Sequence, residues 1–155
     1  MEVTDLRSTI WALTRRVADN LERVFQPVCE AHGLTSAQLR VLFSLHEHGC
    51  TVGQLTCRLS MQNGNTSALC RKMEKEGLLV RDRDPQDQRV VQLQLTQAGE
   101  ALVQTIQCEL EARYAKKLQR QNAQAVQQIV TGLTQLCTLL EQMHTCEEET
   151  DHGGQ

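Results

Sequence analysis

Residues 51–95 read TVGQLTCRLSMQNGNTSALCRKMEKEGLLVRDRDPQDQRVVQLQL, and this stretch decides the fold. It opens on Thr-Val-Gly-Gln, where Thr51 and Gln54 have the spacing of a capping box, so a short helix is expected to start there. The polar segment SMQNGNT at 60–66 interrupts that helix. A second helix follows and stops at Gly77, a residue type that commonly ends helices.

The same stretch continues into a hairpin. LLV at 78–80 leads into RDRDPQDQR at 81–89, and VVQLQL at 90–95 then alternates apolar and polar residues with the period of a strand. Asp84 and Pro85 suit the first two positions of a type I turn. Residues 81–89 are therefore expected to form most of a two-stranded hairpin.

Upstream, the sequence predicts one short and one long helix. Thr-Ser-Ala-Gln at 35–38 is another capping box, and its helix is expected to end at Gly49. Before it, a long helix over about 3–32 is expected to end near Gly33, with Pro27 kinking or loosening its last turn. Apolar residues at helical spacing give this helix one continuous stripe: Leu6, Ile10, Leu13, Val17, Leu21, Val24 and Val28.

Downstream, two more helices are expected, at about 97–120 and 122–145. The second carries an apolar stripe formed by Ile129, Leu133, Leu136, Leu140 and Met143. The final segment CEEETDHGGQ, residues 146–155, has no apolar period, and we expect a disordered acidic tail there.

Together these elements predict a mostly α-helical fold with a small β-hairpin. Three short helices followed by a hairpin, at about 35–95, is the order of a winged helix-turn-helix lobe, whose third helix enters the DNA major groove. The helices at about 3–32 and 97–145 are too long and too apolar along one side to stay single. We therefore expect one domain over 1–145, with a dimerisation region that makes a homodimer matching a two-fold operator.

Charge and hydropathy limit the classes of function. The net charge is −3, but residues 141–155 contain five acidic residues and no Lys or Arg, which leaves +2 for the rest of the chain. No apolar run approaches the length of a membrane span, so no membrane partner is expected. The first residues, MEVTDLRSTIW, lack the apolar core of a signal peptide, which favours a cytoplasmic protein.

Sequence motifs argue against catalysis. The chain contains no HExxH, G-x-S-x-G, P-loop or dinucleotide-binding glycine pattern, so neither an enzyme nor a bound cofactor is expected. Seven cysteines are an odd number, and no CxxC occurs. Reduced thiols in small core positions are therefore favoured over a disulfide framework.

At this point the sequence resembles the MarR family of bacterial transcription regulators, over residues 5–145. The matching stretches are GLTSAQLRVLFSL at 33–45, TVGQLTCRLSMQNGNTSALCRKMEKEGLLVR at 51–81 and DPQDQRVVQLQLTQAGEAL at 84–102. The last stretch is the most specific, because an Asp-x-Arg in the wing precedes a strand and then Leu-Thr-x-x-Gly. The resemblance implies a sequence-specific DNA-binding regulator, a ligand-responsive repressor that acts as a homodimer on a pseudo-palindromic operator.

The resemblance places the recognition helix on residues 62–76. Its core-facing positions would be Thr66, Leu69, Cys70 and Met73. The DNA-facing set would be Gln62, Asn63, Asn65, Ser67 and Arg71, with Lys72 and Lys75 further along. Asn and Gln can pair with adenine edges and Arg with guanine. Ala68 stands where many members carry a basic residue, and Gly64 weakens the first turn by about 1 kcal/mol, which leaves Arg71 as the main cationic reader.

The resemblance also assigns roles in the hairpin wing. Arg89 would enter the minor groove, oriented by Asp87, because a narrow A·T minor groove attracts arginine. Arg83 and Arg81 would contact phosphates or form an anchoring ion pair. Arg58, in the preceding helix, would contact a phosphate and so position the protein without specifying sequence.

The resemblance leaves the effector open. Members usually respond to small anionic or aromatic ligands held between the dimer helices and the DNA-binding lobe. For such a pocket, we single out four residues: Trp11, Arg15, Phe43 and His46. An alternative is that Trp11 and Phe43 are ordinary core residues.

Three alternative functions accompany this reading. Some relatives sense oxidants, for which Cys70 on the recognition helix and Cys29 near the end of the first helix are candidates, although buried thiols are generally inert. Metal sensing would rest on His46, His48 and Cys50, or on three residues near the tail: His144, Cys146 and His152. Neither group has the spacing of a tetrahedral zinc site, so no metal is predicted. A winged helix used only for protein contacts is the third alternative.

Overall fold

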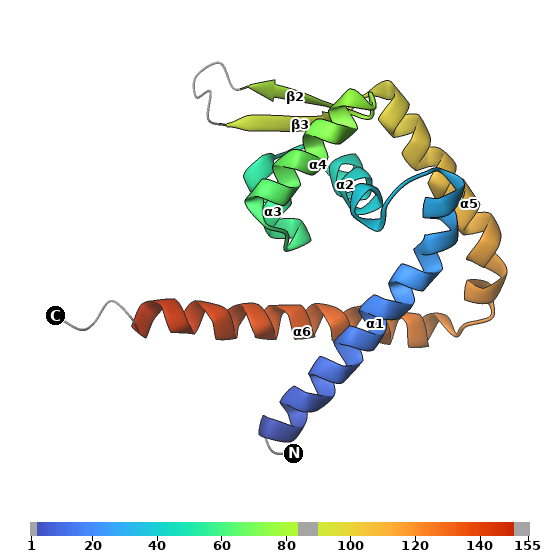
Figure 1. Ribbon diagram of the computed structural model, residues 1–155. Coiled ribbons are helices and arrows are strands. Elements are labelled where there is room, and N and C mark those ends of the chain that lie inside the picture. Colours follow the sequence, from blue (N-terminus) through green and yellow to red (C-terminus); the bar gives the residue numbers. More distant parts are fainter. Residues whose placement is uncertain (1–2, 84–89, 151–155) are drawn as a thin grey trace. The chain divides into compact units, whose positions relative to one another are not determined.

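The computed structural model describes residues 3–83 and 90–150, which form two compact units, Met1–Glu111 and Ala112–Gln155 (Figure 1). The first unit holds the DNA-binding lobe expected from the sequence. The boundary between the units falls inside one helix. The elements in chain order are α1 (Val3–Ala31), α2 (Ser36–Glu47), β1 (Cys50–Thr51), α3 (Val52–Leu59), α4 (Asn63–Lys75), β2 (Leu79–Arg83), β3 (Val91–Leu95), α5 (Gln97–Gln119) and α6 (Ala123–Thr150).

Both capping boxes predicted from the sequence are confirmed. Thr35 Oγ1 accepts a hydrogen bond from the backbone N–H of Gln38 at 3.2 Å, and the Gln38 side chain accepts one from the backbone N–H of Thr35 at 3.0 Å. Thr51 and Gln54 repeat this arrangement at the start of α3. The two boxes fix where α2 and α3 begin, because they satisfy backbone donors that a helix leaves free at its N-terminus.

Two glycines end helices as predicted. Gly33 (φ +64°) follows α1, and Gly77 (φ +73°) follows α4. Both take the left-handed conformation, which glycine adopts without a steric penalty. Pro27 lies inside α1, and the helix continues past it to Ala31.

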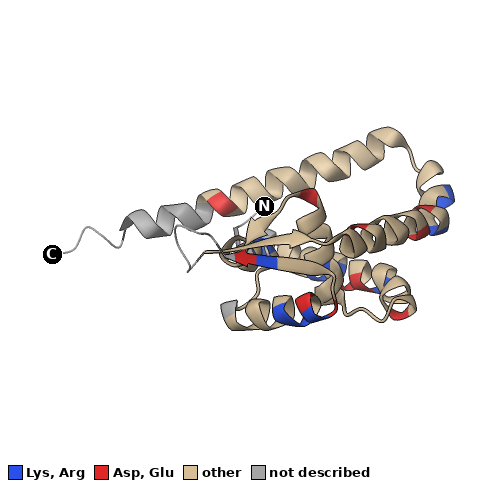
Figure 2. Cartoon of the chain, turned by 90° about the horizontal axis from the view of Figure 1, so that it is seen from above, with Lys and Arg blue, Asp and Glu red and all other residues tan. Residues whose placement is uncertain are grey.

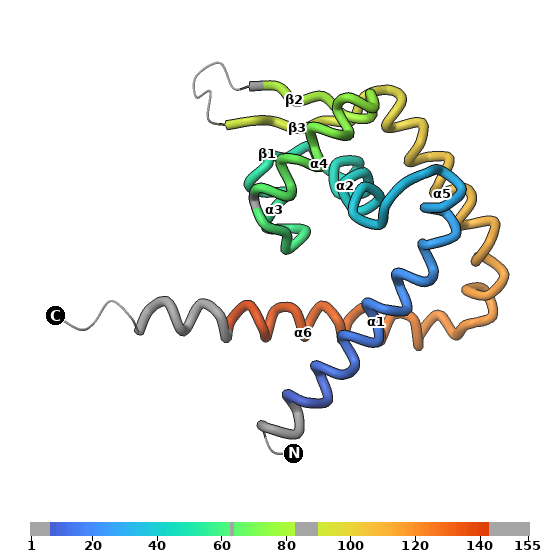
Figure 3. The backbone as a smooth tube through the Cα atoms, viewed as in Figure 1, coloured from blue at the N-terminus to red at the C-terminus, as the bar shows by residue number. Residues whose placement is uncertain are grey.

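The pairing of the two hairpin strands is confirmed, and they belong to a larger sheet, whereas the predicted turn at Asp84 and Pro85 lies outside the described residues. β2 and β3 pair antiparallel, and β1 adds a third strand on the far side of β3, which the sequence did not predict (Figure 3). Cys50 and Arg81 both pair with Leu93, so the three side chains share one face of the sheet. Cys50 and Leu93 are buried on that face, where α4 contacts β2.

The core of the lobe consists of small and medium apolar side chains. It joins α2, α3, α4, α5 and the sheet through Val41, Leu42, Leu45, Cys50, Leu55, Leu59, Cys70, Met73, Leu79, Leu93 and Val103. A neighbouring cluster joins α1 to α2 and α5 through Val28, Cys29, Leu39 and Ile106. Helix α4 itself packs against α3 and β2.

The second unit contains the end of α5 and all of α6. The apolar side chains along α6 are exposed, among them Val126, Ile129, Leu133 and Leu140. The helix runs to Thr150, which places residues 146–150 in a helix where the sequence suggested disorder, and 151–155 lie outside the described residues. Within the described part of the chain, no helix combines the length and apolarity needed to cross a membrane.

Candidate nucleic-acid interface

Helix α4 has one buried and one exposed face, as predicted. Thr66, Cys70 and Met73 have no exposed surface, and Leu69 is half-buried. Gln62, Asn65, Arg71, Lys72 and Lys75 are exposed, and Ser67 is half-buried. The side chain of Asn63 lies outside the described residues. The exposed face thus offers amide and basic groups, which are the groups that hydrogen-bond to base edges and phosphates.

Two side-chain bonds from α2 hold the helix-turn-helix in place. Buried Gln38 donates from Nε2 to Oε2 of Glu76 at 2.8 Å, which ties the start of α2 to the end of α4. Arg40 donates from Nη2 to the carbonyl oxygen of Leu59 at 2.7 Å, which satisfies an orphan carbonyl at the end of α3. Ser60, directly after that carbonyl, takes the left-handed conformation (φ 50°) that begins the turn into α4.

The basic residues around α4 differ in their contacts and exposure. Lys72 lies 3.7 Å from a carboxylate oxygen of Glu76 one turn later, an exposed pair that contributes little to stability. Arg71 is exposed, as is Arg58 in the last turn of α3. Both side chains are therefore accessible to a partner such as a DNA phosphate.

Arg81 on β2 faces inward toward the end of α4. Its Nη1 lies 3.8 Å from a carboxylate oxygen of Glu74, and its buried Nε has no hydrogen-bond partner among the residues that the structure describes. Of the two roles suggested for Arg81, this geometry supports the anchoring ion pair. The side chain of Arg83, and all of Asp87 and Arg89, lie outside the described residues, so their DNA roles stay predictions.

Comparison with known proteins agrees with this geometry. Residues 34–91, from the loop before α2 to β3, match the model of the MarR family. The homoprotocatechuate degradative operon repressor of Escherichia coli is 28% identical over 116 residues, which cover 74% of this chain and 78% of the repressor. Residues 34–91 thus form a MarR-type domain. Its relatives are transcriptional regulators and not enzymes.

Two solved structures resemble this chain over most of its length. NadR, solved in complex with 4-hydroxyphenylacetate, is 26% identical, with a TM-score of 0.69 over 82% of this chain and 89% of NadR. MepR of S. aureus, solved in complex with DNA, is 22% identical, with a TM-score of 0.69 over 82% of this chain and 95% of MepR. The second likeness shows that the two chains share a fold.

The structure does not gather the four predicted ligand residues into one pocket. Trp11 is 73% exposed, and Arg15 is also exposed. Phe43 is half-buried and meets Phe25 edge to face, with 6.3 Å between ring centroids. His46 Nδ1 lies 2.7 Å from a carboxylate oxygen of Glu100, so His46 links α2 to α5.

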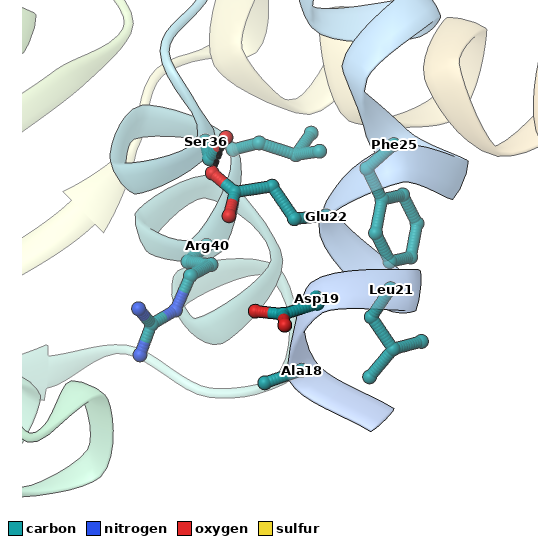
Figure 4. A pocket seen from close by; sticks show the side chains of 8 residues that line it. Ala18, Asp19, Leu21, Glu22, Phe25, Ser36 and Arg40 are labelled. Atoms are coloured by element: carbon teal, nitrogen blue, oxygen red, sulfur yellow. Dashed lines mark hydrogen bonds between the residues drawn. The ribbon is translucent and has the colours of Figure 1, made fainter. Parts of the chain in front are cut away.

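A cavity of about 450 Å³ lies instead between α1 and α2 (Figure 4). Its lining residues are Ala18, Asp19, Leu21, Glu22, Phe25, Ser36, Leu39 and Arg40. Glu22 accepts a hydrogen bond from the Ser36 hydroxyl at 3.3 Å across the two helices. The sequence did not predict this cavity, because its shape depends on how α1 and α2 meet.

The two predicted redox cysteines are buried. Burial raises the pKa of the Cys29 thiol, and it raises that of the Cys70 thiol although nearby Arg81 acts in the opposite direction. Because the thiolate is the reactive form, both thiols are less reactive than a free cysteine at neutral pH. The geometry therefore favours a packing role for Cys70 and Cys29.

The residues suggested for metal sensing are not brought together either. Among the described side chains, no three His, Cys, Asp or Glu residues gather as metal ligands would. Cys50 is buried in β1, where burial raises the pKa of its thiol, and His48 is exposed. The side chains of His144, Cys146 and His152 lie outside the described residues.

Proposed function

We propose that this protein is a ligand-responsive repressor that acts in the cytoplasm and binds a pseudo-palindromic DNA operator as a homodimer. The observation that carries the proposal is the division of α4 into a buried apolar face and an exposed face with Gln62, Asn65 and Arg71. That face can both read bases and contact phosphates. MepR, which shares the fold, was solved in complex with DNA, which supports the same use of the lobe.

The test is selection of bound duplexes from a random pool, followed by titrations at rising salt. Binding should weaken with a slope of about −0.9 in log K per phosphate neutralised. Arg71→Ala should cost about 1–3 kcal/mol at one base position if the arginine makes a bidentate base contact. A uniform loss over all sequences would make Arg71 a phosphate contact, and no salt-dependent binding to any duplex would favour a protein-interaction module instead.

Exposed apolar side chains support the homodimer. Trp11, Leu13, Val17 and Leu21 are exposed along α1, and a second row is exposed along α6. Monomers rarely leave apolar rows of this length in water, because their burial is favourable. Sedimentation equilibrium should therefore give twice the mass of the chain.

The cavity between α1 and α2 suits a small aromatic ligand. Phe25, Leu21 and Leu39 can cover an aromatic ring, and Arg40 can pair with an acidic substituent. Since Arg40 also binds the carbonyl of Leu59 at the end of α3, a ligand that draws its guanidinium away would disturb the turn into α4. NadR, solved with 4-hydroxyphenylacetate, supplies the probe.

The probe should lower operator affinity of the wild type, because it competes for the Arg40 guanidinium. Arg40→Met, which keeps the length of the side chain and removes its donors, should bind the operator with the lowered affinity of the probe-bound wild type, and the probe should not lower that affinity further. Fluorescence anisotropy of a labelled operator measures both. An equal response of the two proteins would exclude this cavity as the site.

A further inference from the structure

The exposed side of α4 carries three cations that differ in their neighbours. Arg71, Lys72 and Lys75 are all exposed. Among the residues that the structure describes, Lys72 alone of the three has an ion pair, with 3.7 Å between its Nζ and Oε1 of Glu76. In Figure 2, basic residues (blue) and acidic residues (red) alternate over the last turns of α4. A negative charge therefore accompanies one particular cation of the candidate DNA-binding face.

The place of Glu76 in the helix is unfavourable by itself. Glu76 is the C-cap residue of α4, next to the last backbone carbonyls of the helix. The helix macrodipole is negative at that end, so a carboxylate there is repelled. Lys72 and Lys75 in the last turn offset part of this repulsion. A contact from outside α4 is expected to offset the rest.

A buried amide on α2 supplies that contact. Gln38 is 1% exposed, and its Nε2 donates to Oε2 of Glu76 at 2.8 Å. The other end of the amide is fixed as well, because Gln38 Oε1 accepts from the backbone N–H of Thr35 at 3.0 Å and from the Thr35 hydroxyl at 3.1 Å. Hydrogen bonds to a charged acceptor are stronger than neutral ones. The Glu76 carboxylate is therefore held in place by Oε2, while Oε1 is the atom near Lys72.

The fixed carboxylate distinguishes this pair from an ordinary one on the surface. An exposed ion pair usually contributes little, partly because both long side chains lose freedom when they pair. Here Gln38 already restrains the carboxylate, so Lys72 is the partner that still loses freedom. A DNA phosphate that approaches the Lys72 ammonium has to displace this fixed negative charge. Since lysine contacts to phosphates contribute to binding of any sequence, the carboxylate is expected to weaken binding to every duplex.

We propose that Glu76 is a positioning residue that acts through Lys72: its carboxylate competes with DNA phosphates for the ammonium group and so lowers the affinity of the lobe for DNA. This inference rests on the proposed DNA binding and adds a residue that sets its strength. The bond from Gln38 then does more than tie α2 to α4, because it also holds the competing charge in place. Phosphates are common to operator and random DNA, so Glu76 should change both affinities by the same factor.

Glu76→Gln in the full chain tests the proposal, because its amide oxygen can still accept from Gln38 while the charge is removed. Thermal unfolding should therefore give the wild-type midpoint. Fluorescence anisotropy should show affinity for both operator and random duplexes rising about two- to fivefold at low salt. The slope of log K against log salt should steepen by up to about 0.9 for each lobe that binds. Unchanged affinity and slope overturn the inference, whereas a wild type without salt-dependent binding to any duplex would overturn the proposed function itself.

A double-mutant cycle shows whether the effect passes through Lys72. Glu76→Gln is combined with Lys72→Met and, in a matched control, with Lys75→Met. Lys75 has the same charge on the same helix but no ion pair among the described residues. The gain in affinity and the steeper slope should persist beside Lys75→Met and vanish beside Lys72→Met, because the two partners are coupled. Equal gains in both backgrounds would reflect a general loss of negative charge near DNA, and would overturn the role assigned to Glu76.

Discussion

Helices α4 and α6 contain similar apolar residue types but use them in opposite ways. In α4, Cys70 and Met73 have no exposed surface, and the exposed side is polar. In α6, Ile129 is 61% exposed and Leu133 45% exposed. The DNA-binding lobe thus satisfies its own packing, whereas α6 carries an apolar row that only another surface can cover. Rigidity is expected of the first and partner-dependence of the second.

The largest effect is expected from a substitution that disrupts the packing of the DNA-binding lobe. In α5, a Cβ added to Gly99 would lie 2.1 Å from the carbonyl oxygen of Leu78, a backbone atom that cannot move aside cheaply. Gly99→Ala should therefore lower the free energy of unfolding by about 3 kcal/mol or more, at or beyond the upper end of ordinary overpacking. Urea denaturation measures the loss. A variant with the same urea midpoint as the wild type would show that the backbone around Gly99 and Leu78 can shift at little cost.

The next largest effect is expected in α6, whose apolar row depends on a partner for its burial. Leu133→Glu places a charge in the centre of the α6 row and should raise the dimer dissociation constant about a hundredfold, or roughly 2.7 kcal/mol. The lobe should keep its folded structure, because Leu133 takes no part in either described core cluster. Gln135→Glu, on an exposed polar position of the same helix, is the matched control. Equal changes in the dimer dissociation constant from the two substitutions would mean that the apolar row of α6 is not part of the dimer interface.

The same contrast explains what the sequence could predict. Capping boxes at Thr35 and Thr51, stop signals at Gly33 and Gly77, and the alternation in residues 90–95 are local, so helix ends and the hairpin followed directly. The two-residue strand β1 did not, because its only reason to exist is its pairing with Leu93 and Gln92 in β3. Non-local pairing leaves no periodic trace in so short a segment.

The candidate site also has one part that the sequence predicts and one part that it does not. The buried and exposed faces of α4 follow from helical spacing, and the structure confirms the buried positions, Thr66, Cys70 and Met73. The cavity between α1 and α2 depends on how two helices meet, and no pattern in either helix specifies that. Arg40 illustrates the limit, since its bond to the carbonyl of Leu59 joins residues 19 positions apart.

A smaller effect is expected where the lobe depends on a local signal. Thr35→Ala removes the hydroxyl that accepts from the N–H of Gln38, and should lower the free energy of unfolding by about 1 kcal/mol. Thr35→Ser keeps the hydroxyl and should retain most of the stability. Thermal unfolding compares the two variants. Equal losses would mean that the methyl group, and not the cap, stabilises this turn.

The smallest effect is expected when the glycine-to-alanine substitution made at Gly99 is made in α6 instead. Gly132 lies inside α6, and a Cβ added there meets no atom within 4 Å. Gly132→Ala should raise the free energy of unfolding by up to about 1 kcal/mol, because alanine loses less backbone entropy on forming a helix. Thermal unfolding at several protein concentrations separates this gain from dimer effects. A loss of stability that grows with protein concentration would show that the second copy packs directly against Gly132. This residue would then lie inside the dimer interface.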